Sequence, residues 1–148
     1  MVDGTPRELR RRGGRRDTGG SAGRRFVVYW LPALVWAGVI FGLSSMSEPP
    51  KPGPVAELPG WTLLAHGSEY FILGVLLFRA GGAIEGWRPS SAYLFAAFAA
   101  TLYGATDELH QVFVPERQMD ALDWLVDCLG ASVGALVMLP WRYKRNKT

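Results

Sequence analysis

The sequence predicts an all-α membrane protein with four transmembrane helices, and the grouping and flanks of its apolar residues indicate this. Phe26 to Leu43 contains no charged residue. As a helix it would rise roughly 27 Å, close to the hydrocarbon thickness of a bilayer. Three further apolar runs follow at residues 61–80, 91–106 and 121–140. Basic residues precede the first run and follow the last, which predicts two cytoplasmic ends and an even number of crossings.

The polar segments set the expected domain boundaries. Residues 1–25 are rich in Gly and Arg and are expected to form a disordered basic cytoplasmic arm. Residues 26–140 form the transmembrane domain, and residues 141–148 a basic cytoplasmic tail. The arm contains no aromatic residue and directly precedes a membrane helix. We therefore expect the lipid bilayer, and no nucleic acid, to be its partner.

The connections between the runs also fit this topology. The first loop, "SSMSEPPKPGPVAELPG", carries one lysine against two glutamates, whereas Arg79 and Arg88 flank the second loop. The first and third loops are therefore expected to face outward. Pro115 disfavours a helical conformation for the residue before it. The segment "FVPERQM" is accordingly predicted to be a polar re-entrant or interfacial loop between the third and fourth helices.

This topology would bring polar residues of three helices to one depth near the outer surface. Ionisable groups at membrane depth are costly unless they are paired or face a wet cavity, so they are functional candidates by default. The residues concerned are His66 and Glu69 on the second helix, Asp107 to Gln111 at the end of the third, and Asp120, Asp123 and Asp127 at the start of the fourth.

On the fourth helix the acidic residues continue a stripe of small residues. Asp123, Asp127, Gly130 and Gly134 recur at helical spacing, and "GASVG" has the small-xxx-small pattern that lets membrane helices approach closely. The acidic end should therefore point at a neighbouring helix. That neighbour is either a helix of the same chain or one of a second copy in a homodimer.

Structural roles compete with functional ones for several of these groups. Asp120 can cap the fourth helix, and Asp123 can compensate the positive end of its dipole. His66 and Glu69 can form a structural hydrogen-bonded pair. Arg117 can neutralise the acidic cluster or hold a ligand phosphate or carboxylate.

The histidines raise two questions of chemistry that the sequence leaves open. "HGSE" and "DELH" each place a carboxylate and a histidine three residues apart, a spacing found in carboxylate-bridged metal sites of helical bundles. If a metal is bound, its ligands are expected among His66, Glu69, Asp107 and His110. Any other cofactor is unknown. Nucleophilic catalysis by Ser44 or Ser45 with His66 as base is the other alternative.

The segments "FGLSSMSEPP", "HGSEYFILGVLL" and "DELHQVFVPERQMDALDWLVDCLGASVG" resemble the VanZ-like family of small bacterial membrane proteins. The resemblance implies a multi-pass protein of the bacterial cytoplasmic (inner) membrane, in a family named for a protein associated with resistance to the glycopeptide antibiotic teicoplanin. It establishes no reaction. The family's recurring polar positions correspond to Ser45, His66, Tyr70, Asp107, Glu108, Gln111, Arg117, Asp123 and Asp127.

Two positions depart from the family's pattern. Glu116 stands where the family often has glycine, between Pro115 and Arg117. Many relatives carry asparagine at the position of Asp127, which weakens the case for a role that demands a negative charge there.

Three functional hypotheses follow. In the first, an outward-facing pocket binds a cell-wall precursor or lipid-linked ligand and so influences envelope composition or teicoplanin sensitivity. In the second, the chain is a membrane-embedded hydrolase or transferase acting on lipid-linked substrates. In the third, it is a structural or assembly partner. Catalytic roles are assigned to His66, Glu69, Asp107 and Asp123. Binding roles are assigned to Ser45, Tyr70, Glu108, Gln111, Arg117 and Asp127.

Overall fold

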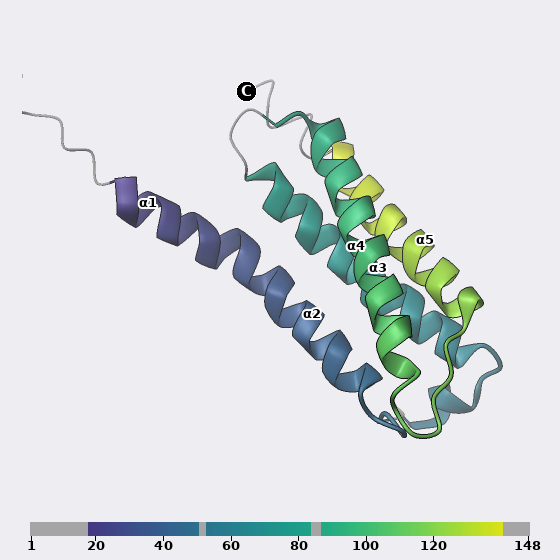
Figure 1. Cartoon of the computed structure of the whole chain (residues 1–148). Helices are drawn as coiled ribbons and strands as arrows, with labels where there is room; N and C mark the ends of the chain where they lie inside the picture. The colour runs from purple at the N-terminus through teal and green to yellow at the C-terminus, as the bar shows by residue number, and fades with distance from the viewer. Residues whose placement is uncertain (1–17, 51–52, 84–86, 141–148) are drawn as a thin grey trace, which may run out of the picture.

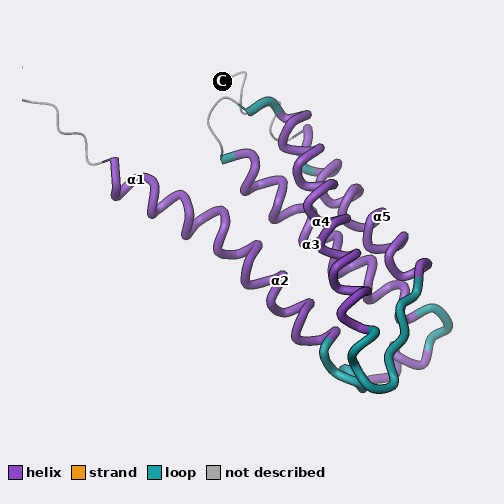
Figure 2. Tube along the Cα trace, viewed as in Figure 1, coloured by secondary structure: helices purple, strands orange, loops and turns teal. Residues whose placement is uncertain are grey.

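The computed structural model describes residues 18–50, 53–83 and 87–140, and within these residues the chain is helical with no strand (Figures 1 and 2). The elements in chain order are α1 (Thr18–Arg25), η2 (Phe26–Trp30), α2 (Leu31–Ser44), η3 (Gly53–Glu57), α3 (Trp61–Gly82), α4 (Pro89–Gln111) and α5 (Ala121–Val137).

The first apolar run lies on a helix that begins before the expected boundary at Phe26. Thr18–Arg25 is already helical, and α1, η2 and α2 follow one another without a break. The π-helical turn η2 comes directly before the Leu31–Pro32 start of α2, where proline lacks the amide donor that a regular helix needs. Residues 1–17 of the expected arm and the tail 141–148 lie outside the described residues.

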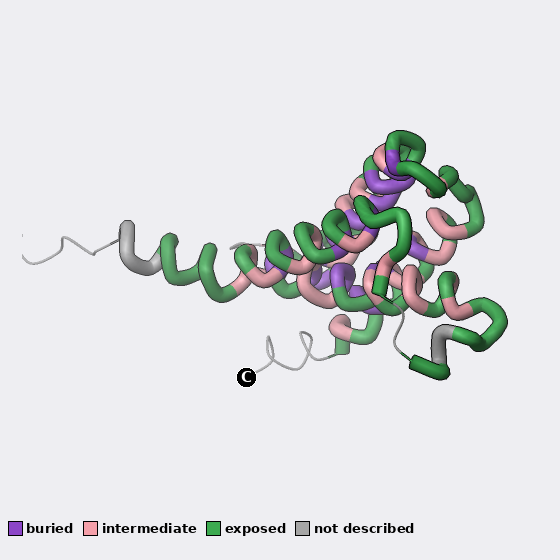
Figure 3. The backbone as a smooth tube through the Cα atoms, turned by 90° about the horizontal axis from the view of Figure 1, so that it is seen from below, coloured by how far each residue is buried: buried purple, intermediate pink, exposed green. Residues whose placement is uncertain are grey.

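Helices α3, α4 and α5 pack side by side into a bundle, while α1 points away from it (Figure 1). Buried residues concentrate inside the bundle, and the outer end of the first helix is exposed (Figure 3). One core cluster forms around Tyr70 and Leu73, and a second around Phe78. On α4 the buried face repeats small residues at every fourth position, namely Ala92, Ala96, Ala100 and Gly104.

The small-residue stripe of α5 packs against α3 of the same chain. A Cβ added at Gly130 would collide with the backbone oxygen of Gly67, and one at Gly134 with that of Phe71. From the other side, a Cβ at Gly74 would collide with the backbone of Ala131. Glycine is therefore required at these positions because two helix backbones lie in direct contact. The sequence predicted that this stripe faces a neighbouring helix without saying which, and that helix is α3 of the same chain.

Within the described residues, two helices are by length and composition apolar enough to cross a membrane: Ala22–Ser44 and Trp61–Gly82. Helices α4 and α5 carry rows of apolar side chains that point away from the bundle. On α4 the exposed row includes Leu94, Phe98, Leu102 and Leu109, and on α5 it comprises Leu122, Leu125, Leu129, Val133 and Leu136.

Candidate functional site

The polar residues singled out from the sequence gather at one end of the bundle. The C-terminal ends of α2 and α4 and the N-terminal ends of α3 and α5 lie at this end, together with the loops that follow α2 and α4 (Figure 1). Helix α4 continues to Gln111, past the apolar run that ends at residue 106, so Asp107, Glu108 and Gln111 belong to its last turns, as expected from the sequence. All three are buried.

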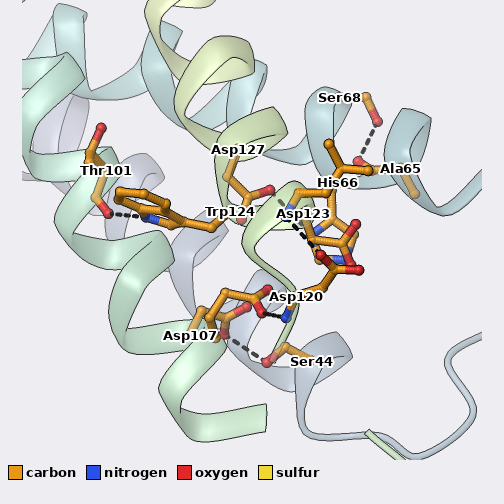
Figure 4. A network of polar contacts seen from close by, with 12 residues as sticks. Ser44, Ala65, His66, Ser68, Thr101, Asp107, Asp120, Asp123, Trp124 and Asp127 are labelled. Atoms are coloured by element: carbon orange, nitrogen blue, oxygen red, sulfur yellow. Dashed lines mark hydrogen bonds and ion pairs between the residues drawn. The ribbon is translucent and has the colours of Figure 1, made fainter. Parts of the chain in front are cut away.

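His66 lies between two carboxylates of α5. Its Nδ1 is 3.2 Å from Oδ1 of Asp127, and its Nε2 is 3.9 Å from Oδ2 of Asp123. Figure 4 shows the three side chains pointing toward one another from α3 and α5. Asp127 is completely buried, whereas His66 and Asp123 are half-buried. The shorter contact is a hydrogen bond that links α3 to α5 at the polar end.

A second contact attaches α2 to α4. Ser44 Oγ donates a hydrogen bond of 2.7 Å to Oδ1 of Asp107, and both residues are buried (Figure 4). Further from the polar end, the same two helices are joined again, because the Tyr103 hydroxyl donates a hydrogen bond of 2.6 Å to the backbone oxygen of Ala37. The indole of Trp36 donates to the backbone oxygen of Glu69 at 2.9 Å, which joins α2 to α3.

The start of α5 is fixed by Asp120 and Glu108. Asp120 Oδ1 accepts a hydrogen bond of 2.7 Å from the amide of Leu122, so Asp120 caps the helix as predicted. The backbone amide of Asp120 donates in turn to Oε2 of Glu108 at 2.8 Å. One oxygen of Glu108 therefore holds the end of the loop against α4.

A cavity of about 370 Å³ opens beside these contacts. One part of its lining is apolar and comes from α2, the following loop and the start of α3. The other part is polar. The lining residues are Leu43, Ser44, Pro49, Pro50, Trp61, Thr62, Ala65, His66, Glu69, Asp107, Gln111 and Arg117.

Arg117 reaches this cavity from the loop between α4 and α5. Its Nε donates a hydrogen bond of 3.1 Å to the backbone oxygen of Met46, in the loop after α2. The preceding residue, Glu116, has a φ of 64°, in the left-handed region that favours glycine. This explains why glycine suits the position: the backbone must turn sharply to carry Arg117 to the cavity.

The structure places the predicted site residues in three groups. His66, Glu69, Asp107, Gln111 and Arg117 line the cavity. Tyr70, Glu108 and Asp127 are buried within the bundle, and Asp123 lies beside His66. Ser45 and His110 form a separate pair, with Ser45 Oγ 3.1 Å from His110 Nε2 and the His110 ring stacked on Phe41 at a centroid distance of 4.5 Å.

The four residues expected as metal ligands from the two "His–carboxylate" spacings do not come together as one group in the structure. Among the described residues, the group whose ligand atoms lie within 4.8 Å of one another is His66, Glu108 and Asp127. His66 is its sole member from the expected set. The signal missed in the sequence was the position of Glu108 one residue after Asp107, which turns it toward α5.

The structure also bears on the serine alternatives. Ser44 donates to Asp107, and Ser45 donates to the backbone oxygen of Phe41 at 2.6 Å. Neither hydroxyl is hydrogen-bonded to His66. The buried hydroxyl at the cavity is that of Ser44, while Ser45, the residue expected from the family resemblance, is exposed.

The two long apolar helices and the polar end of a tight bundle are features of a helical membrane protein. The VanZ/LLP1 family model matches residues 26–142, and the chain belongs to this family. The match agrees with the resemblance found in the sequence. Comparison with curated proteins and with solved structures finds no match.

Proposed function

We propose that the chain crosses the bacterial cytoplasmic membrane four times, with both ends in the cytoplasm and the polar end facing outward. At helical rise, the 23 residues of α4 and the 17 of α5 measure roughly 35 and 26 Å. The exposed apolar rows on both helices are suited to lipid contact, because these side chains have no partner inside the bundle. The basic flanks at both ends of the sequence support the orientation.

The function supported best is binding of an anionic headgroup of a cell-envelope component, such as a cell-wall precursor or another lipid-linked molecule. The observation that supports this proposal is the composition of the cavity lining. Leu43, Pro49 and Trp61 form an apolar side, whereas Asp107 and Arg117 belong to the polar side. A lipid-linked molecule has the same division, since a polar head is joined directly to a hydrocarbon chain.

Arg117 is the candidate for contacting the anionic group. Its Nε is engaged by the backbone oxygen of Met46, and its terminal amino groups make no hydrogen bond within the part of the chain that the structure describes. A guanidinium held in this way presents two parallel donors, which is the geometry that recognises phosphate and carboxylate. Through such binding the protein would influence envelope composition or teicoplanin sensitivity.

A second candidate, a membrane-embedded hydrolase or transferase acting on lipid-linked substrates, is favoured by the position of His66. The ring lies on the cavity wall with Asp127 and Asp123 on its two nitrogens. Asp127 on Nδ1 fixes the ring and stabilises the protonated form that arises during catalysis, and Nε2, at 3.9 Å from Asp123, is the nitrogen that would accept the proton as general base. Because Ser44 and Ser45 are engaged elsewhere, the reaction in this case would use water or a substrate hydroxyl as nucleophile.

The test is made in a bacterium that lacks its own copy of the gene. Teicoplanin sensitivity and membrane abundance are measured for the wild type, Arg117→Ala, His66→Ala and Asp123→Asn. Arg79→Ala is the matched control, because Arg79 is exposed at the opposite end of α3. We expect Arg117→Ala and His66→Ala to lose the effect at normal abundance while Arg79→Ala retains it. A parallel loss of abundance and effect would support the structural or assembly role instead.

Binding is then measured with purified protein in lipid nanodiscs, using a polyprenyl phosphate and the uncharged polyprenol as probes. Headgroup recognition by Arg117 predicts tighter binding of the phosphate and loss of that preference in Arg117→Ala. If the protein is an enzyme, His66→Ala and Asp123→Asn should abolish turnover of the lipid-linked substrate and leave its binding intact. Equal binding of both probes by the wild type would overturn headgroup recognition.

A further inference from the structure

One cluster near the cavity is not explained by headgroup binding. His66 of α3, Glu108 of α4 and Asp127 of α5 bring their ligand atoms within 4.8 Å of one another. Glu108 and Asp127 are 3% and 0% exposed, and neither lines the cavity. Three different helices thus contribute one nitrogen-bearing and two oxygen-bearing side chains to a single buried point.

The two carboxylates are each only half satisfied. Oε2 of Glu108 accepts from the amide of Asp120, and Oδ1 of Asp127 is bonded to His66. The other oxygens, Glu108 Oε1 and Asp127 Oδ2, are buried and have no hydrogen-bond partner among the described residues. Such an arrangement is costly for a purely structural carboxylate, because a buried acceptor without a partner loses its hydration and gains nothing in return.

No described lysine or arginine offsets the charge of this cluster. The ion pairs formed there join His66 to Asp123 and Asp127. Arg117 is hydrogen-bonded to the backbone oxygen of Met46 in the loop. A small cation that reaches both orphan oxygens would satisfy them together, which one protonated histidine cannot do.

We propose that His66, Glu108 and Asp127 bind one divalent cation of the zinc class. An imidazole with two carboxylates selects Zn²⁺ or Mn²⁺ over Mg²⁺ and Ca²⁺, which prefer sites made of oxygen alone. Ligands of one Zn²⁺ at about 2.0 to 2.2 Å from the ion lie roughly 3 to 3.5 Å apart. The ligand atoms of the trio lie within 4.8 Å of one another, so small side-chain rotations would bring them into this range. In binding the ion, Nδ1 of His66 would exchange its hydrogen bond to Asp127 for the metal bond.

The neighbouring carboxylate fits the same arrangement. If Nδ1 of His66 binds the ion, Nε2 carries the ring proton and faces Oδ2 of Asp123, at 3.9 Å in the structure. A carboxylate behind a metal-bound histidine orients the ring and increases its basicity. Three protein ligands also leave an open coordination position. This inference does not rest on the proposed envelope ligand.

The experiment uses the full chain in detergent micelles or nanodiscs, stripped with a chelator and then titrated with Zn²⁺. Calorimetry and elemental analysis should give about one ion per chain, with a higher unfolding temperature at saturation. Glu108→Gln and Asp127→Asn keep the side-chain shapes and should weaken binding by more than about tenfold, and Asp123→Asn by about tenfold. Glu48→Gln, exposed in the loop after α2 and outside the cluster, is the matched control and should bind as the wild type does.

X-ray absorption at the zinc edge keeps the proposal testable if a ligand variant fails to fold. The expected first shell contains nitrogen and oxygen only. A sulfur ligand would assign the ion to Cys128 and overturn the proposal. So would the absence of stoichiometric Zn²⁺, or binding that survives both Glu108→Gln and Asp127→Asn. None of these outcomes changes the prediction for Arg117→Ala with the polyprenyl phosphate, so the two proposals fail separately.

Discussion

Two regions of the bundle, the contact between α3 and α5 in its middle and the polar end where α4 joins them, differ in how completely their groups are satisfied. In the middle of the bundle, the helix backbones touch at Gly74 and Gly134, where a methyl group has no room. At the polar end, Glu108 and Asp127 are equally buried, yet each retains an oxygen without a described hydrogen-bond partner. Close backbone packing holds α3 and α5 together in the middle of the bundle, whereas the hydrogen bond between His66 and Asp127 links them at the polar end. Stability and site chemistry should consequently be separable by mutation.

The largest expected effect comes from breaking the packed region. In Gly134→Ala the new methyl group meets the backbone oxygen of Phe71, which cannot rotate away as a side chain could. We expect a loss of about 2 to 3 kcal/mol, at the upper end of the range for overpacking. The measurement is thermal or denaturant unfolding of the purified protein in detergent, together with abundance in the membrane.

Gly38→Ala is the control for that substitution. Gly38 is exposed on α2, and a Cβ there meets nothing within 4 Å. Its stability should stay the same or rise, because alanine is the better helix former. If Gly134→Ala is as stable as Gly38→Ala, then α3 and α5 are not in backbone contact and the contrast between the two regions disappears.

A smaller loss is expected where α2 joins the polar end. Ser44→Ala removes the donor to Asp107 and leaves a buried carboxylate oxygen without its partner. The expected loss is about 1 to 3 kcal/mol, the cost of an unsatisfied buried acceptor. Ser68→Ala is the matched control, since Ser68 is exposed and bonded to the backbone of its own helix. Equal effects of the two substitutions would show that Asp107 does not depend on Ser44.

The sequence predicted that the polar residues meet at one end of the bundle. This prediction requires only the order and direction of the helices. Ends that are connected by short loops meet at one end of a bundle, so His66, Asp107 and Asp123 had to approach one another. The small-residue stripe of α5 was predictable for a similar reason, since its period follows from helix geometry alone. The cap at Asp120 needed only local sequence.

The sequence could not predict which side chains of the polar cluster contact one another. A step of one residue turns a side chain by roughly 100° around a helix. The choice between Ser44 and Ser45 for Asp107, or between Asp107 and Glu108 for the trio with His66, therefore depends on how the helices are rotated against each other. For α3 and α5 that rotation is set by the glycine contacts in the packed region. The cavity depends in addition on the course of the two loops, which periodicity does not describe.

The smallest expected effect is a gain in stability, and it sharpens the comparison at the loop that carries Arg117. Glu116 has a φ of 64°, a conformation that costs a residue with a Cβ roughly 1 to 2 kcal/mol. Glycine removes this strain but loses more chain entropy on folding, so Glu116→Gly should stabilise the protein by about 0.5 to 1 kcal/mol. Unfolding in detergent measures the difference.

Glu116→Ala separates the backbone effect from the effect of charge. It removes the carboxylate and keeps the Cβ, so it should give no comparable gain. If alanine stabilises as much as glycine does, repulsion between Glu116 and the acidic cluster is the cause, and the strained turn contributes little. If only glycine stabilises, this chain maintains a strained turn next to Arg117. Both the strained backbone at Glu116 and the unsatisfied buried carboxylates would then lower the stability of the polar end. The packed region of the same bundle has neither feature.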